Sequence, residues 1–221
     1  MEPAKNTNKK VKVYEDLRQR IISGALRPGL PINEADFAAQ LEVSKTPIRE
    51  ALRQLEREGF VENVPGRGST ISHITSQEIR DVFEIREIIE SGVTKRVAQL
   101  KGNQELQNEY EKIRKYLETH RDSDELVHEF GIWEDMHFSL VKALGNQTLL
   151  QMYKGILDRI TRIRNHYGKS FTGRRLHDIL TEHAEILEAV VTGEATEAED
   201  KLRYHLQNAG KFLLGLSLGQ D

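Results

Sequence analysis

The chain has 221 residues, of which 38% are hydrophobic and 30% are charged, and its formal net charge is −3. This composition indicates a folded, helix-rich protein of two modules rather than a disordered chain. The absence of cysteine excludes disulfide bonds, thiolate nucleophiles and cysteine-ligated zinc sites. No apolar run reaches the roughly 18 residues that a spanning helix needs, and the N-terminus lacks the apolar core of a signal peptide. We therefore expect a cytoplasmic protein with no membrane partner.

The basic charge of the chain is concentrated in its N-terminal third. Residues 1–73 contain 12 Lys and Arg against 10 Asp and Glu, whereas the remainder contains 20 against 25. The overall net charge argues against indiscriminate coating of nucleic acid, but it does not exclude a local basic surface. Only this first third carries a net positive charge, which attracts nucleic acid.

Three short helices followed by two strands are predicted in this third. Residues 1–10 are polar and basic, and we expect a flexible N-terminus there. Apolar side chains then recur at helical spacing in three segments, and two β-like runs flank a turn with the sequence PGRG. The helices are expected over 13–24, 33–42 and 45–59, and the strands over 60–64 and 69–74.

This order of elements is typical of a winged helix-turn-helix domain over residues 11–74. In such a domain the second helix of the motif enters the major groove with its N-terminal residues at the base edges. From the element order alone, the alternative is a small α+β domain of another kind.

The rest of the chain, residues 75–217, gives only helical patterns. Short breaks separate six segments, and this arrangement predicts an antiparallel all-helical bundle. The fold class is therefore mainly α, with one small β hairpin. The six predicted helices cover residues 76–100, 103–120, 123–144, 147–167, 174–192 and 195–215.

The third predicted helix begins with side chains suited to contact a nucleic acid. Hydroxyls and backbone amides bind phosphates, and long cations bind phosphate or guanine. In the hairpin turn, a cation between two glycines can reach a neighbouring groove while the chain passes close to the duplex. These groups favour DNA binding over a merely solvated face, and the candidates are Ser44, Lys45, Thr46, Arg49 and Arg67.

The sequence from Leu17 to Ser72 resembles the DNA-binding domain of the GntR family of bacterial transcription regulators. The resemblance runs through GALRPG, VSKTPIREAL, LEREG and the glycine-rich turn. It implies a homodimer that reads a near-palindromic operator, with the five candidates above and the hairpin residue Gly66 at the DNA-contacting positions. Position 45 is more often Arg in the family, and Lys45 cannot make the bidentate guanine contact of an arginine.

Three histidines lie on three different predicted helices of the bundle. His137, His183 and His205 each share a helix face with apolar side chains, so all three can point inward. A lone histidine on such a face is usually a satisfied core or surface residue, but helical bundles also build metal sites from facing helices. Spacing alone leaves both interpretations open.

Two segments of the bundle, 136–146 and 182–206, resemble the FCD domain, the all-helical ligand-binding domain of the FadR subfamily of GntR regulators. The resemblance implies a divalent metal, commonly zinc or nickel, held by the three histidines and an Asp. Trp133 stands at the position of that Asp, and Glu134 is the candidate carboxylate ligand in its place. The resemblance further implies sensing of a small organic acid.

Three arginines are candidates for holding the carboxylate of such an effector. Arg86 lies at the edge of the inward stripe of its helix, where it either pairs with Glu90 or points into the bundle pocket. Arg162 and Arg164 are candidates of the same kind, with a solvated helix face as the alternative.

The leading interpretation is a dimeric, DNA-binding transcription regulator whose operator affinity responds to a small carboxylate. One alternative is a metal-dependent hydrolase built on the histidine-lined bundle, and another is a protein-interaction module that uses the Lys45 and Arg49 face. The sequence has no His-Glu-x-x-His motif, and a hydrolase would leave the basic helix unexplained, so we expect no enzyme.

Overall fold

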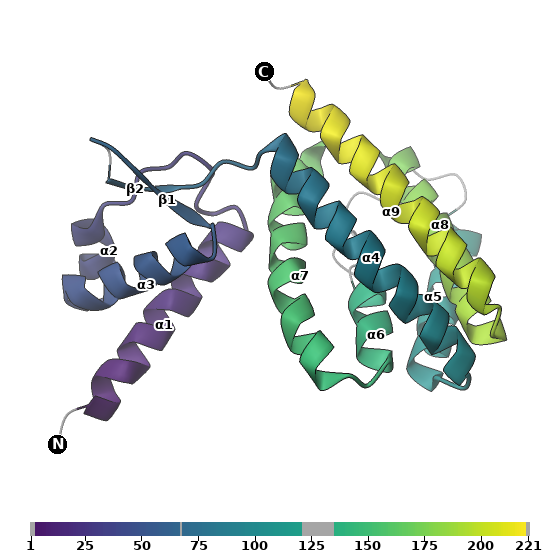
Figure 1. Cartoon of the computed structure of the whole chain (residues 1–221). Coiled ribbons are helices and arrows are strands. Elements are labelled where there is room, and N and C mark those ends of the chain that lie inside the picture. The colour runs from purple at the N-terminus through teal and green to yellow at the C-terminus, as the bar shows by residue number, and fades with distance from the viewer. Residues whose placement is uncertain (1–2, 67, 121–134, 220–221) are drawn as a thin grey trace. The chain divides into compact units, whose positions relative to one another are not determined.

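The computed structural model describes residues 3–66, 68–120 and 135–219, and it is mainly helical with one small hairpin (Figure 1). This arrangement confirms the predicted fold class. The chain forms two compact units. The N-terminal unit comprises Met1–Ile74 with Thr161–His166, and the helical unit comprises Thr75–Ile160 with Tyr167–Asp221.

Three helices build most of the N-terminal unit, and they are α1 (Pro3–Ile22), α2 (Glu34–Gln40) and α3 (Lys45–Arg57). The side chain of Asn33 caps α2 by accepting a 2.9 Å hydrogen bond from the backbone N–H of Ala35. Helix α1 starts earlier than expected, because residues 3–10 are helical rather than loose. Proline suits the first helical position, and no glycine or further proline interrupts the following turns.

Strands β1 (Val61–Val64) and β2 (Gly68–Ile71) form an antiparallel hairpin, in which Val61 pairs with Ile71. The segment before α2 adds to this hairpin through an isolated bridge between Pro31 and Thr70. No strand pairing was predicted for this segment from the sequence. The bridge connects the chain between α1 and α2 to β2, the second strand of the hairpin.

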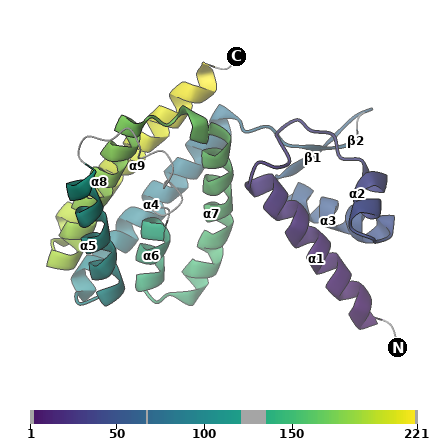
Figure 2. The same ribbon diagram turned by 180° about the vertical axis from the view of Figure 1, so that it is seen from behind.

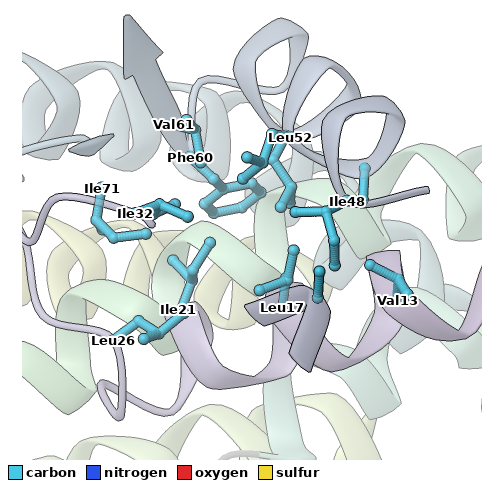
Figure 3. Close-up of a cluster of buried hydrophobic side chains, with 13 residues drawn as sticks. Val13, Leu17, Ile21, Leu26, Ile32, Ile48, Leu52, Phe60, Val61 and Ile71 are labelled. Atoms are coloured by element: carbon cyan, nitrogen blue, oxygen red, sulfur yellow. The ribbon is translucent and has the colours of Figure 1, made fainter. Parts of the chain in front are cut away.

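A single hydrophobic cluster holds the N-terminal unit together. The side chains of Leu17 and Ile21 on α1 point toward Ile48 and Leu52 on α3, and Phe60 fills the space beside them (Figure 3). All five are buried, which explains why apolar side chains recur at helical spacing along both helices. The packing leaves the N-terminal end of α3 free to face solvent.

The helical unit is a bundle whose longest helices, α4 (Ser76–Leu100) and α9 (Ala195–Leu218), run side by side (Figure 1; Figure 2). Helix α8 packs against α9, and α5 packs against α8. Capping side chains of Thr75, Asn103, Asn146 and Thr172 fix the starts of four helices. The remaining helices are α5 (Gln104–Thr119), α6 (Asp135–Ala143), α7 (Gln147–Tyr167), the 3-10 turn η3 (Gly168–Ser170) and α8 (Gly173–Thr192).

Across the described residues, every helix is too short or too polar to cross a membrane.

Candidate DNA-binding surface and metal centre

The first turn of α3 presents its polar groups to solvent. Ser44 is the N-cap residue with an extended backbone, but its side chain makes no capping hydrogen bond to the described residues. Ser44, Lys45 and Thr46 are all exposed, whereas Pro47 in the same turn is buried. The start of α3 is therefore accessible from solvent, as a phosphate-binding helix start requires.

Arg49 lies one turn further along α3, and its guanidinium is tied to the preceding helix of the motif. Its Nε atom lies 2.7 Å from Oε2 of Glu34 on α2. The Arg49 side chain is nonetheless 59% exposed, so the pair sits at the surface. An exposed ion pair of this kind contributes little to stability, which leaves the guanidinium available to exchange one anion for another.

The tip of the hairpin contains Gly66 with a backbone φ of +77°, a conformation that favours glycine. A methyl group there would meet no described atom within 4 Å, so the glycine serves the turn and not close packing. Arg67, the predicted wing cation, lies outside the described residues.

The three predicted histidines come together in the interior of the helical unit. His137 on α6, His183 on α8 and His205 on α9 are buried, and one nitrogen from each ring lies within 4.8 Å of the others. The ring centroids are 4.6 Å apart for His183 and His205, and 5.2 Å apart for each pair that includes His137. Glu134, the predicted carboxylate ligand, lies outside the described residues.

Two carboxylates fix the orientation of two of these rings. The Nδ1–H of His137 donates to Oε2 of Glu90 at 2.7 Å, and the Nδ1–H of His205 donates to Oε2 of Glu182 at 2.6 Å. With the proton on Nδ1, the Nε2 atom of each ring carries the lone pair that binds a metal. Metal-binding histidines commonly have a carboxylate on the other nitrogen, because it fixes ring and tautomer.

Glu90 is the centre of a buried polar network on α4. Besides His137, it accepts a 2.7 Å hydrogen bond from Nε of Arg86 and a 2.6 Å hydrogen bond from the hydroxyl of Tyr153 on α7. Burial alone would raise the pKa of the Glu90 carboxyl, but the Arg86 guanidinium, followed by His137, lowers that pKa far below its usual range. Glu90 is therefore an ionised carboxylate that accepts hydrogen bonds from three side chains.

Arg86 thus follows one of the two predicted alternatives, the pairing with Glu90. The ion pair is buried on both sides, with 4% of the Arg86 side chain and 1% of the Glu90 side chain exposed. A buried guanidinium held by a carboxylate is costly to separate from it.

Burial also disfavours the charged forms of His137 and His205. It lowers the pKa of His137 in spite of the opposing charge of Glu90, and it lowers the pKa of His205 still further, with help from His137 and Arg86. Neutral imidazoles are the form that coordinates metal ions.

The other two predicted effector arginines, Arg162 and Arg164, belong to the N-terminal unit, whereas the three histidines belong to the helical unit. Arg162 is buried, donates to the backbone carbonyl of Ser72 and lies over the ring of Phe60, with 5.7 Å between the guanidinium carbon and the ring centroid. Arg162 therefore does not lie on a solvated helix face.

Sequence reasoning missed Glu34, Tyr153 and Glu182. Glu182 directly precedes His183, and its position on α8 gives no hint that it reaches His205 on another helix. Tyr153 lies on α7, and only the packing of that helix brings it to Glu90. Within this polar network, a sequence signal existed only for the pair of Arg86 and Glu90, whose spacing of four residues is typical of a helical ion pair.

Family comparisons agree with this geometry. Residues 9–71 match the gntR family of bacterial regulatory proteins, and residues 81–208, more than half of the chain, match the FCD domain. The chain belongs to the GntR family, in its FCD-containing FadR branch. It is a transcriptional regulator and not an enzyme.

Individual relatives of this GntR-family chain agree with the assignment. An HTH-type transcriptional regulator in an unstable DNA locus of Streptomyces ambofaciens is 30% identical over 207 residues, which cover 88% of this chain and 80% of the relative. The fold is similar to that of a GntR regulator from Rhodococcus sp. RHA1, with a TM-score of 0.76 and 21% identity over 94% of this chain and 98% of that one. The Zn²⁺-bound FCD domain of TM0439 has a TM-score of 0.54 and 23% identity, over 65% of this chain and 96% of that one.

Proposed function

We propose that this GntR regulator binds its operator as a homodimer through α3 and the wing, and that a metal-anchored organic acid in the helical unit changes its operator affinity. The observation that carries the effector half is the buried cluster of His137, His183 and His205. The exposed start of α3 carries the DNA half.

On DNA, the start of α3 lies in the major groove, where Ser44 and Thr46 bind phosphates and Lys45 acts as a point charge. Arg49 exchanges Glu34 for a phosphate or a guanine. Gly66 and Arg67 bring the wing to the neighbouring groove. The exposure of the α3 residues and the surface position of the Arg49–Glu34 pair support these roles.

The donor set fits a divalent ion such as zinc or nickel. Three neutral imidazoles suit these metals. The Nε2 atoms of His183 and His205 lie 3.3 Å apart, and nitrogens bound tetrahedrally at ~2.0–2.1 Å from zinc are about 3.3–3.4 Å apart. The zinc-bound FCD domain of TM0439 supports the same assignment. We further propose Glu134 as the carboxylate ligand, because Trp133 replaces the Asp that the family uses.

The ion would supply open coordination positions for a carboxylate oxygen of the effector. Arg86 acts on the site through Glu90, because its guanidinium is already held by that carboxylate. Effector binding changes operator affinity only insofar as the effector has different affinities for the DNA-binding and the non-binding arrangement of the dimer.

The test combines metal analysis with DNA binding. We expect about one equivalent of zinc or nickel per chain in the wild-type protein and a loss of that metal in His183→Ala. A duplex that the wild-type protein selects from a random pool should bind far more tightly than a scrambled duplex of equal length, with a steep salt dependence. Equal affinity for both duplexes would refute the DNA half, and a metal-free wild type would refute the metal half.

A further inference from the structure

The helical unit contains an arginine whose side chain is only partly satisfied. Arg175 lies in the first turns of α8, and its Nε and Nη2 atoms are buried without a hydrogen-bond acceptor among the described residues. Its third nitrogen, Nη1, lies 3.7 Å from Oε1 of Glu182, so this ion pair uses only one end of the guanidinium. Buried donors normally have partners, and an orphaned pair on one charged group calls for an acceptor.

The two orphaned atoms form one edge of the guanidinium. Nε and Nη2 donate two parallel N–H bonds in the plane of the group, which is the geometry that matches the two oxygens of a carboxylate. Arg86 differs in this respect, because the same edge is already taken by the carboxylate of Glu90.

The surroundings of Arg175 restrict how an acceptor can approach. The guanidinium carbon lies 5.4 Å from the centroid of the Phe212 ring, so the ring covers one face of the group. The ring of Phe171 lies 5.1 Å from that of Phe212 and extends the apolar wall. An acceptor must therefore come edge-on, and an apolar wall beside it suits the carbon chain of an organic acid better than a bare inorganic ion.

Arg175 is also connected to the histidine cluster. Glu182 contacts Arg175 through Oε1 and the Nδ1 atom of His205 through Oε2. The charges of Arg175 and Glu182 balance each other, as do those of Arg86 and Glu90. A divalent ion on three neutral histidines then leaves an excess of positive charge, which favours an anionic ligand.

We propose that the Nε and Nη2 edge of Arg175 binds a carboxylate group of the effector, an organic acid with an apolar chain. The proposal rests on the effector-sensing function proposed above. It gives Arg175 the carboxylate-binding role for which Arg86, Arg162 and Arg164 were the candidates from the sequence.

The experiment measures binding of acetate and of succinate to the zinc-loaded full-length protein by calorimetric titration, with chloride at equal ionic strength as the blank. The informative variant is Arg175→Lys, which keeps the charge beside Glu182 but lacks the two-pronged edge. Arg175→Gln removes both and provides a second variant if the lysine form folds poorly. Arg174→Lys is the matched control, because Arg174 is the exposed neighbour on the same helix. Zinc content is measured for every sample.

We expect saturable succinate or acetate binding in the wild type and in Arg174→Lys, and binding roughly tenfold or more weaker in both Arg175 variants at equal zinc content. Equal binding in the wild type and the Arg175 variants would overturn this inference and leave the proposed sensing function standing. No saturable binding of either acid to the zinc-loaded wild type would overturn both.

Discussion

The Nδ1 atom of His137 lies 2.7 Å from Oε2 of Glu90, and both side chains are buried. This hydrogen bond joins α6 to α4 and directs the opposite nitrogen of His137 toward the other two histidines. Because Arg86 and Tyr153 hold the same carboxylate, the position of the imidazole depends on three other side chains that do not themselves belong to the histidine cluster.

Replacing Glu90 with Gln should therefore weaken metal binding without removing a metal ligand. The amide cannot hold the His137 Nδ1–H, the Arg86 guanidinium and the Tyr153 hydroxyl as the carboxylate does. Loss of such a supporting carboxylate typically weakens metal affinity by about 10–100-fold. Competition with a chromophoric chelator measures the affinity, and the visible spectrum of the cobalt-substituted protein reports the ligand geometry.

Glu84→Gln is the control for this variant, because Glu84 is an exposed glutamate on the same helix. Tyr153→Phe removes only one donor to Glu90 and should have a smaller effect on affinity. If Glu90→Gln binds metal as tightly as the wild type and gives the same cobalt spectrum, Glu90 does not position His137.

Operator binding should depend on Arg49 more than on other cations of α3. Arg49→Ala should lower operator affinity and reduce the slope of log affinity against log salt by about 1 if Arg49 contacts a phosphate. If Arg49 instead reads a guanine, the loss should be about 1–3 kcal/mol and should relax the base preference at one position of the site. Fluorescence anisotropy at several salt concentrations separates the two outcomes.

Arg53→Ala is the matched control, since Arg53 is another exposed arginine of α3 one turn further from its start. Glu34→Gln tests the ion-pair partner of Arg49. This variant should bind the operator slightly more tightly, because Arg49 would no longer have to leave a carboxylate. Arg49→Ala and Arg53→Ala with identical operator affinity and salt slope would contradict the assignment of Arg49.

Much of the fold followed from the sequence, because apolar periodicity records the face that each helix buries. The predicted segments 76–100 and 147–167 coincide with α4 and α7, and α8 differs by one residue at its start. The inward positions of the three histidines followed from the same periodicity. Glycine and proline punctuation located the hairpin, because turns require their particular backbone geometry.

The polar contacts between helices could not be predicted in this way. Whether Arg86 finds Glu90 or an effector depends on the depth at which α4 packs, and the reach of Glu182 to His205 depends on the register of α8 against α9. The four-residue spacing permits the Arg86–Glu90 pair but does not decide between it and an effector. Neither helix propensity nor spacing indicates the contact between Glu182 and His205. The helical N-terminus differs from the prediction for another reason, since a polar composition suggests disorder although Pro3 can begin a helix.

Tyr14 should make the N-terminal unit sensitive to alkaline pH. Its hydroxyl lies 2.9 and 2.8 Å from the two carboxylate oxygens of Glu58, and burial together with Glu58 raises the pKa of Tyr14 to about 12 from 10.0. The folded state therefore holds the phenol proton more tightly than the unfolded state. The resulting stability is fully present below pH 10 and is lost as the pH rises toward 12.

Comparison of the wild type with Tyr14→Phe isolates this effect. The difference in their free energy of unfolding, measured with urea, should shrink between pH 10 and pH 12, whereas Tyr204→Phe at an exposed site should show no such change. A constant difference across this range would mean that the Glu58 contact does not favour the protonated phenol.

Leu17 should be the most sensitive position of α1. Its side chain is 0% exposed and packs in the cluster with Ile48 and Leu52 of α3. Leu17→Ala removes three buried carbon atoms and leaves a cavity, so the N-terminal unit should lose about 2–5 kcal/mol of stability. Val11→Ala on the same helix is the control, because the Val11 side chain is 46% exposed and its truncation should cost within about 0.5 kcal/mol.

Hydrogen exchange of peptides covering α1 and α3 measures the free energy of opening for this unit alone. Because the same cluster anchors the inner face of α3, Leu17→Ala should weaken operator binding as well, and unchanged protection of both helices would show that they do not depend on this contact.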